Sequence, residues 1–132
     1  MAKLHKTGRF IGGRGIGENS AVLLDGDFVT VSGGFIAKAG VAEAIEGITA
    51  GSQTMAADNQ TVDKVNVEYI KADDYMEFVI AADAAIVQAD VGKHYSLNAD
   101  QTVDVLTGAA TGLEVKLVKF VDQLTSIYAI VR

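Results

Sequence analysis

Short apolar runs separated by turn residues limit the fold class of this chain. Residues 64–71 alternate between polar and apolar side chains and place Val65, Val67 and Tyr69 on one predicted face. This two-residue period is typical of a half-buried β-strand. Proline is absent, so glycine, asparagine and aspartate must shape the turns. The pattern predicts an all-β domain, built as a small β-barrel or sandwich.

The first third of this domain is predicted to be a tight meander of strands. Its turn signals are Asp25-Gly26 and Ser32-Gly33-Gly34, which are residue types that favour tight hairpin turns. They separate three apolar runs, at 21–24, 28–31 and 35–38.

Later segments add further predicted strands. Residues 76–80 are predicted to pair back on 64–71 across a turn at 72–74. The nearly all-apolar run 126–131 predicts a central strand. Extended structure is also predicted at 95–97 and 113–120.

Three segments are ambiguous. Helix propensity favours a helix within 39–50, but flanking glycines leave it little length, so we favour a strand at 43–50. The alanine-rich stretch 81–90 is predicted to hold one or two helical turns. Residues 59–63 and 100–104 resemble each other, and we favour reused turn chemistry over a duplicated half-domain.

Composition excludes several function classes. The chain has 132 residues and is 49% hydrophobic, which suits a single domain with one core. It has no cysteine, so disulfides, thiolate nucleophiles and cysteine-ligated zinc are excluded. The net charge of −6 argues against nucleic acid as a partner. We also expect no membrane partner, because no apolar run approaches the roughly 18 residues of a membrane span.

The first 17 residues differ in kind from the rest. They hold four basic residues, five glycines and no acidic residue, whereas the remainder holds 7 basic and all 17 acidic residues, a net charge of −10. A basic, glycine-rich segment buries too little apolar surface to fold alone. We therefore expect residues 1–17 to form an extended arm and residues 18–132 to form the β domain.

No catalytic, cofactor or metal site is predicted. Residues 12–17 fit no phosphate-binding loop, because Glu18 stands where the pattern needs glycine. His5 and His94 are isolated in the sequence, and the aspartates at 25–27 and 73–74 are typical of turns rather than of calcium loops. Asn59 begins a formal glycosylation sequon that we expect to be silent.

The arm carries the one positive binding signal. Its cations suit an acidic partner, and its apolar side chains would add contacts that salt does not screen. The predicted binding residues are Lys3, Lys6, Arg9, Phe10, Ile11 and Arg14.

Several phrases in the sequence resemble a known family when taken in order. Leu24–Thr30 with Ser32–Phe35 resembles the opening hairpin of small β-barrel proteins on tailed-phage heads. Asp90–Leu97 resembles their segment of Asp-Val-Gly-Lys, an aromatic residue and a leucine, and residues 117–121 resemble their C-terminal region. These are the capsid decoration, or cement, proteins, and the resemblance covers roughly residues 20–132.

The resemblance implies a non-enzymatic virion protein. It would be made in the host cytoplasm and would stabilise the exterior of a bacteriophage capsid by bridging subunits of the major capsid protein. Self-association on the shell stays open. The alternatives are another virion role, such as a head–tail connector, tail component or fibre-anchoring base, and a ligand-binding barrel.

Overall fold

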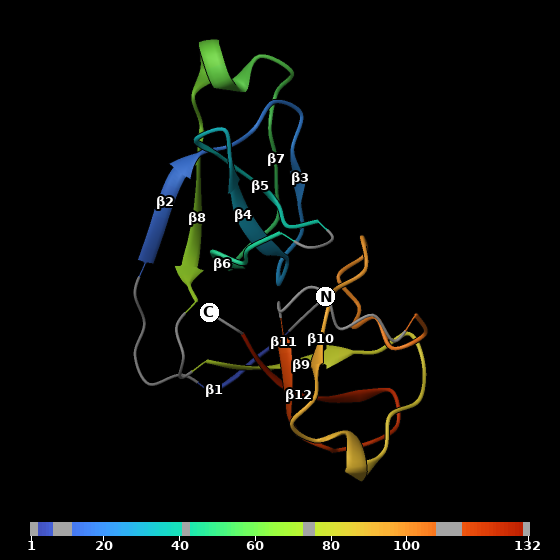
Figure 1. The fold of residues 1–132 in the computed structure, drawn as a ribbon. Helices are drawn as coiled ribbons and strands as arrows, with labels where there is room; N and C mark the ends of the chain where they lie inside the picture. Colours follow the sequence, from blue (N-terminus) through green and yellow to red (C-terminus); the bar gives the residue numbers. More distant parts are fainter. Residues whose placement is uncertain (1–2, 7–11, 41–42, 73–75, 108–114, 131–132) are drawn as a thin grey trace.

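The computed structural model of the protein describes residues 3–6, 12–40, 43–72, 76–107 and 115–130. In this part of the chain, 12 β-strands account for nearly all regular structure, which confirms the all-β prediction. The other elements are a π-helical turn, η1 (Asn59–Asp63), and a 3-10 turn, η2 (Gln88–Asp90). The strands form two five-stranded sheets and one two-stranded sheet, and Figure 1 shows the second five-stranded sheet above the first.

The first sheet is antiparallel and has the order β1-β9-β12-β11-β10. The C-terminal strand β12 lies in the middle, as its apolar sequence predicted. Its neighbours bury alternate residues, which fits the period of a half-buried strand. The strands are β1 (Lys3–Lys6), β9 (Glu77–Ala81), β10 (His94–Tyr95), β11 (Val115–Lys119) and β12 (Thr125–Ile130).

The second sheet is antiparallel and has the order β2-β8-β6-β4-β5. The predicted hairpin joins β4 to β5 through Gly33 and Gly34, whose φ values of 57° and 89° need the conformational freedom of glycine. The strands are β2 (Gly12–Ile16), β4 (Phe28–Ser32), β5 (Phe35–Lys38), β6 (Gly47–Thr49) and β8 (Asn66–Lys71). The small third sheet pairs β3 (Val22–Leu23) with β7 (Gln53–Thr54).

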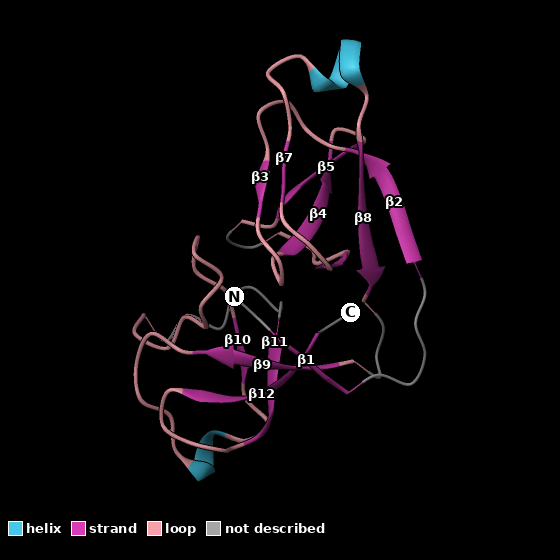
Figure 2. Cartoon of the chain, turned by 180° about the vertical axis from the view of Figure 1, so that it is seen from behind, coloured by secondary structure: helices cyan, strands magenta, loops and turns pink. Residues whose placement is uncertain are grey.

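The main core joins the two large sheets. Phe28 of β4 and Phe78 of β9 are both fully buried and meet edge to face, with ring centroids 5.2 Å apart. Residues from β6 and β8 also join this cluster, together with residues from β10, β11 and β12. A smaller cluster lies between the second sheet and the third, where Leu23, Val29 and Met55 pack together. Figure 2 shows the same arrangement from behind.

The two borders of the second sheet approach each other at one end. A single parallel bridge joins Gly17 to Ile36, and the N–H of Glu18 donates to the Ile36 carbonyl at 2.8 Å. The described strands nevertheless form no closed barrel. The sequence left barrel and sandwich open, and the structure has separate antiparallel sheets around a shared core.

The predicted hairpin between residues 64–71 and 76–80 is wrong. Strand β9 pairs with β12 on one side and with β1 on the other, so the chain crosses from one sheet to the other after β8. Alternation shows which face of a strand is buried, but it does not select the partner strand. Of the predicted turn at 72–74, only Ala72 lies within the described residues.

Residues 1–17 were expected to extend from the body as an arm. The described parts of this segment instead pair with the chain itself: β1 with β9, and β2 with β8. Each is the terminal strand of its sheet. Hydrogen bonding to the body compensates for the little apolar surface that this segment offers.

Gly13 and Gly15 of β2 lie closely against side chains of the smaller core cluster. A Cβ on Gly13 would collide with the ring of Tyr69, and one on Gly15 would lie 2.9 Å from the Ile36 side chain. Gly17, just after the strand, leaves room for the sulfur of Met55, 2.6 Å from where a Cβ would stand. These glycines therefore serve close packing.

The ambiguous segments resolve partly. Strand β6 covers the end of the strand predicted at 43–50, and η2 is one short turn within the predicted helical stretch 81–90. The two resembling segments differ in conformation, because 59–63 is a π-helical turn and 100–104 is not helical. Strand β8 begins at Asn66, so Val65 is exposed rather than buried beside Val67.

Candidate functional site

The predicted binding residues lie in separate parts of the molecule. Lys3 and Lys6 belong to β1, at the border of the first sheet, whereas Arg14 belongs to β2, at the border of the second. The other three, Arg9, Phe10 and Ile11, lie outside the described residues. Arg14 is therefore the one predicted residue whose side-chain surroundings can be examined.

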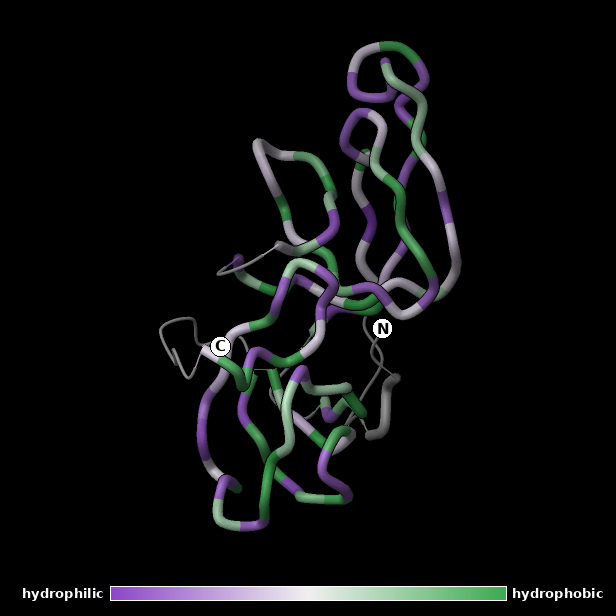
Figure 3. Tube along the Cα trace, turned by 90° about the vertical axis from the view of Figure 1, so that its right-hand side faces the viewer, coloured by the Kyte–Doolittle hydropathy of each residue, from purple (hydrophilic) through white to green (hydrophobic). Residues whose placement is uncertain are grey.

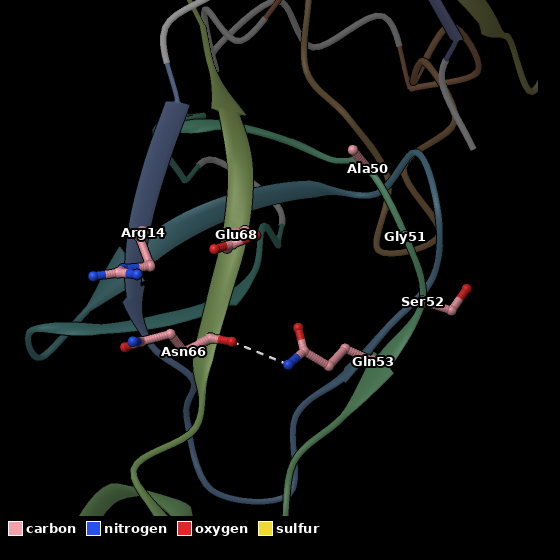
Figure 4. A pocket seen from close by; sticks show the side chains of 7 residues that line it. All are labelled: Arg14, Ala50, Gly51, Ser52, Gln53, Asn66 and Glu68. Carbon is pink, nitrogen blue, oxygen red and sulfur yellow. Dashed lines mark hydrogen bonds between the residues drawn. The ribbon is translucent and has the colours of Figure 1, made fainter.

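Arg14 lies on an exposed face beside residues that sequence reasoning did not select. Its register partner on β8 is Glu68, and both residues are exposed. A hollow of about 370 Å³ lies beside this pair. We call this hollow the β8 slot, and it is lined by Arg14, Ala50, Gly51, Ser52, Gln53, Asn66 and Glu68. Figure 4 shows β8 on one side of the slot and the segment 50–53 on the other.

The slot exists because β6 is short. Strand β6 ends at Thr49, and the chain moves away from β8 until β7 begins at Gln53. Gly51, with a φ of 155°, lies in this departing segment. Gln53 then reaches back, and its Nε2 donates to the Asn66 carbonyl oxygen at 3.0 Å, the bond drawn in Figure 4. One wall of the slot is thus a strand, and the other is a loop held to it by one side chain.

A second hollow of about 420 Å³ adjoins the slot. It shares Arg14, Ala50 and Glu68 with the slot and extends to Tyr69. Burial, with the nearby Glu46 carboxylate as a smaller cause, raises the pKa of Tyr69. The phenol therefore stays neutral at physiological pH.

The slot carries opposite charges that are not directly paired. Among the described residues, ion pairs within 4.0 Å join Lys38 to Asp27 and Lys93 to Asp90. Arg14 and Glu68 form no such pair with each other. The remaining polar lining comes from one hydroxyl and two amides, so the slot offers both donors and acceptors. Its signal in the sequence is weak, because these residues come from three separated segments.

The isolated histidines lie on the first sheet, away from the slot. His5 is in β1, and the half-buried His94 is in β10 opposite Lys116 of β11. Within the described residues, no group of three or more histidine, aspartate or glutamate side chains is placed to hold a metal ion. Asp27 instead accepts the Leu24 N–H at 2.9 Å, which makes it a turn residue.

The glycosylation sequon is engaged in the fold. Asn59 is fully buried, and its Nδ2 donates to the carbonyls of Gly17 and Val65 at 2.8 and 3.1 Å. The nitrogen atom that would carry a glycan is therefore engaged in two hydrogen bonds within the fold. In the described part of the chain, no helix is long and apolar enough to cross a membrane.

Comparisons with protein-family models, with curated proteins and with solved structures find no match to this chain.

Proposed function

We propose that this chain is a structural protein of a bacteriophage head. It binds the capsid exterior and stabilises the shell by bridging neighbouring subunits of the major capsid protein. The observation that carries the proposal is the division of charge: residues 1–17 hold four basic and no acidic residues, and the remainder has a net charge of −10. Such a division favours one oriented contact with an acidic partner.

The topology gives this basic segment a reach that suits bridging. Strand β1 borders the first sheet and β2 borders the second. A partner that contacts residues 1–17 along their length therefore meets both halves of the molecule. The outer border of a terminal strand is also a place where another chain can pair.

Two of the phrases that resemble decoration proteins contain a turn that leads into a strand, β4 or β10, and the third overlaps the end of β11. In the first, the N–H of Asp27 donates to the Leu24 carbonyl at 3.0 Å. In the second, Lys93 Nζ donates to Asp90 Oδ1 at 2.7 Å just before β10. These contacts shape turns of the scaffold, so the resemblance supports the proposal as a likeness in sequence and offers no shared binding site.

Bridging stabilises a shell by mass action. A protein that binds only the assembled shell stabilises each site by about 2.7 kcal/mol when its free concentration is a hundred times Kd. A single exposed ion pair contributes only about 0–1 kcal/mol. Several basic residues must therefore act together, and self-association on the shell would add to them.

The test is binding to purified undecorated capsids. Wild type is compared with a variant that carries glutamate at the four basic positions of residues 1–17, after both show the same cooperative melt. We expect the variant to co-sediment far more weakly and the wild type to saturate at a shell-wide copy number. Equal binding by the two proteins contradicts the role of the basic segment. Closed rings in solution or on a portal favour a connector instead.

A matched control keeps this test interpretable. Lys3 and Lys6 lie in β1, which pairs with β9, so the fourfold variant changes residues within a paired strand of the first sheet. Arg14 is exposed but is the register partner of Glu68, so the neutral change Arg14→Gln removes the positive charge without placing two like charges opposite each other. We therefore expect Arg14→Gln to retain the wild-type melting temperature while it weakens capsid binding severalfold.

A further inference from the structure

The β8 slot exposes backbone groups of a strand that lacks a neighbour there. The N–H of Ala72 donates to the Glu46 carbonyl at 3.0 Å, and the pairing continues with Ile48 opposite Ile70. In an antiparallel ladder, alternate residues direct their backbone groups to the same neighbour. Asn66 and Glu68 therefore direct theirs into the slot.

The opposite side of β8 agrees with this assignment. The N–H of Gly17 donates to the Val65 carbonyl at 3.0 Å, and Gly15 pairs with Val67. The odd-numbered residues of β8 thus bond to β2. The backbone groups of the even-numbered residues of β8 face β6 instead. Strand β6 ends at Thr49, before it reaches the positions opposite Asn66 and Glu68.

Two donors in the slot are left for a ligand. The Asn66 carbonyl is taken by Gln53, but within the described part of the chain no acceptor is hydrogen-bonded to the N–H of Asn66 or to that of Glu68. Because strand residues rise about 3.3 Å each, these two N–H groups lie roughly 7 Å apart along β8. One small anion or hydroxyl group cannot reach both.

An extended peptide matches this spacing, because every second carbonyl along it points the same way. We propose that the β8 slot binds a short extended peptide segment of a partner protein, whose alternate carbonyls accept the N–H groups of Asn66 and Glu68. This is strand addition at a gap inside a sheet rather than at its outer border. The identity of the partner as a capsid subunit rests on the proposed function, but the peptide chemistry does not.

The side chains around the slot suit a peptide backbone better than a charged ligand. Arg14 and Glu68 offset each other, so the slot has no net charge for an isolated anion. Ser52 Oγ, on the facing loop, already accepts the Asp25 N–H at 3.1 Å, and Gln53 Nε2 already donates to the Asn66 carbonyl. These residues can therefore offer the segment the hydroxyl proton of Ser52 and the Oε1 acceptor of Gln53. Ala50 is small and exposed, which leaves the entrance open.

Amide hydrogen exchange of the full chain tests the premise. The N–H groups of Asn66 and Glu68 should exchange at least a hundredfold faster than those of Val67 and Tyr69, which face β2. Comparable protection of all four amides would show that the gap is closed, and this result overturns the proposal.

Binding is tested with the probe N-acetyl-trialanine amide, followed by NMR of the full chain. We expect saturable shifts of the Asn66 and Glu68 amides and slower exchange of both. Ala50→Trp fills the entrance and should weaken binding at least tenfold. The matched control is Ala89→Trp, at an exposed alanine of η2 beside the other sheet, and it should bind as wild type does.

Parallel titrations separate the other ligand classes and the proposed function. Equal shifts with acetate or N-acetylglucosamine would mean a general polar site and would overturn peptide recognition, as would equal binding by Ala50→Trp. No capsid takes part in these titrations, so their failure leaves the proposed function standing. Peptide binding by a protein that fails to bind capsids supports the slot and contradicts the capsid role.

Discussion

Replacing Gln101 with leucine tests how the two halves of the fold are held together. Gln101 lies in a turn with a φ of 66°, and its side chain is fully buried. Its Oε1 accepts the Phe28 N–H at 2.8 Å, while its Nε2 donates to the carbonyls of Phe28 and Ala39 at 2.8 and 3.0 Å. One amide thus continues the hydrogen bonding of β4 where no strand does.

The size of the effect follows from the groups left behind. Gln101→Leu keeps the volume but removes three hydrogen bonds. The Phe28 carbonyl still accepts the Ala39 N–H at 2.9 Å, so it keeps one hydrogen bond in the variant. The Phe28 N–H and the Ala39 carbonyl are the groups that lose their hydrogen bond to residue 101. A buried group without a partner costs about 1–3 kcal/mol. Two such groups, partly offset by the apolar gain of leucine, predict a loss of roughly 3 kcal/mol in the free energy of unfolding.

Gln101→Glu adds a test in which the direction of the change in stability with pH is predicted. A carboxylate can accept the Phe28 N–H but cannot donate to either carbonyl, whereas the protonated acid can donate to one of them. Burial therefore raises the folded-state pKa of the introduced glutamate above its unfolded value of about 4.3. The variant is closest to wild type below that pH, and it loses stability as the pH rises through the folded pKa.

Urea unfolding followed by circular dichroism, at pH 4 and pH 7, measures both effects. The matched control is Gln60→Leu at the corresponding position of the resembling segment, where the side chain of the half-buried Gln60 accepts the N–H of Asn19 at the surface. We expect this control to lose less than about 1 kcal/mol. A Gln101→Leu loss under about 0.5 kcal/mol, or a Gln101→Glu variant without pH dependence relative to wild type, would refute the reasoning.

Three further predictions use single sites. Gly13→Ala should lower the free energy of unfolding by about 1–3 kcal/mol because its Cβ meets Tyr69, while Gly12→Ala, with open space around it, should be neutral in the same urea titration. Tyr128→Phe should leave the melting temperature unchanged or raise it by a few degrees, since among the described residues nothing bonds its buried hydroxyl; a clear drop would reveal a missed partner. Hydrogen bonds from Lys93 and Thr102 lower the pKa of Asp90 and of Asp100, respectively, so stability should be level from pH 8 to 5 and decline below about pH 4 as these carboxylates protonate. Asp100→Asn should flatten that decline in a pH series of thermal melts.

Local features of the fold could be predicted from the sequence, because turn residues and short apolar runs determine them. The Gly33-Gly34 turn needs left-handed backbone, so its hairpin is visible in the sequence. The apolar run at the C-terminus marks a strand buried in the middle of a sheet. Pairing between distant strands is a different matter: β9 beside β12 depends on which apolar faces meet in the core, and no local pattern encodes it.

The buried amides show a second limit. Asn59 and Gln101 both come from polar, turn-like segments, and neither residue type is usually buried. Each is buried because its amide bonds backbone groups that the sheets leave unpaired. The β8 slot is the complementary case, in which such groups remain open. Both depend on where strands end, which sequence patterns locate poorly.

The glycines of residues 12–17 connect folding with binding. Their content alone suggests flexibility, but Gly13, Gly15 and Gly17 are spaced two apart, so they share the face that packs on the smaller core cluster. Arg14, between two of them, falls on the opposite, exposed face. A partner that contacts Arg14 would therefore meet the exposed face of a strand that is paired with β8 and whose other face packs on the smaller core cluster. Changes at Arg14 should then affect binding without unfolding, and changes at the glycines should unfold the border strand first.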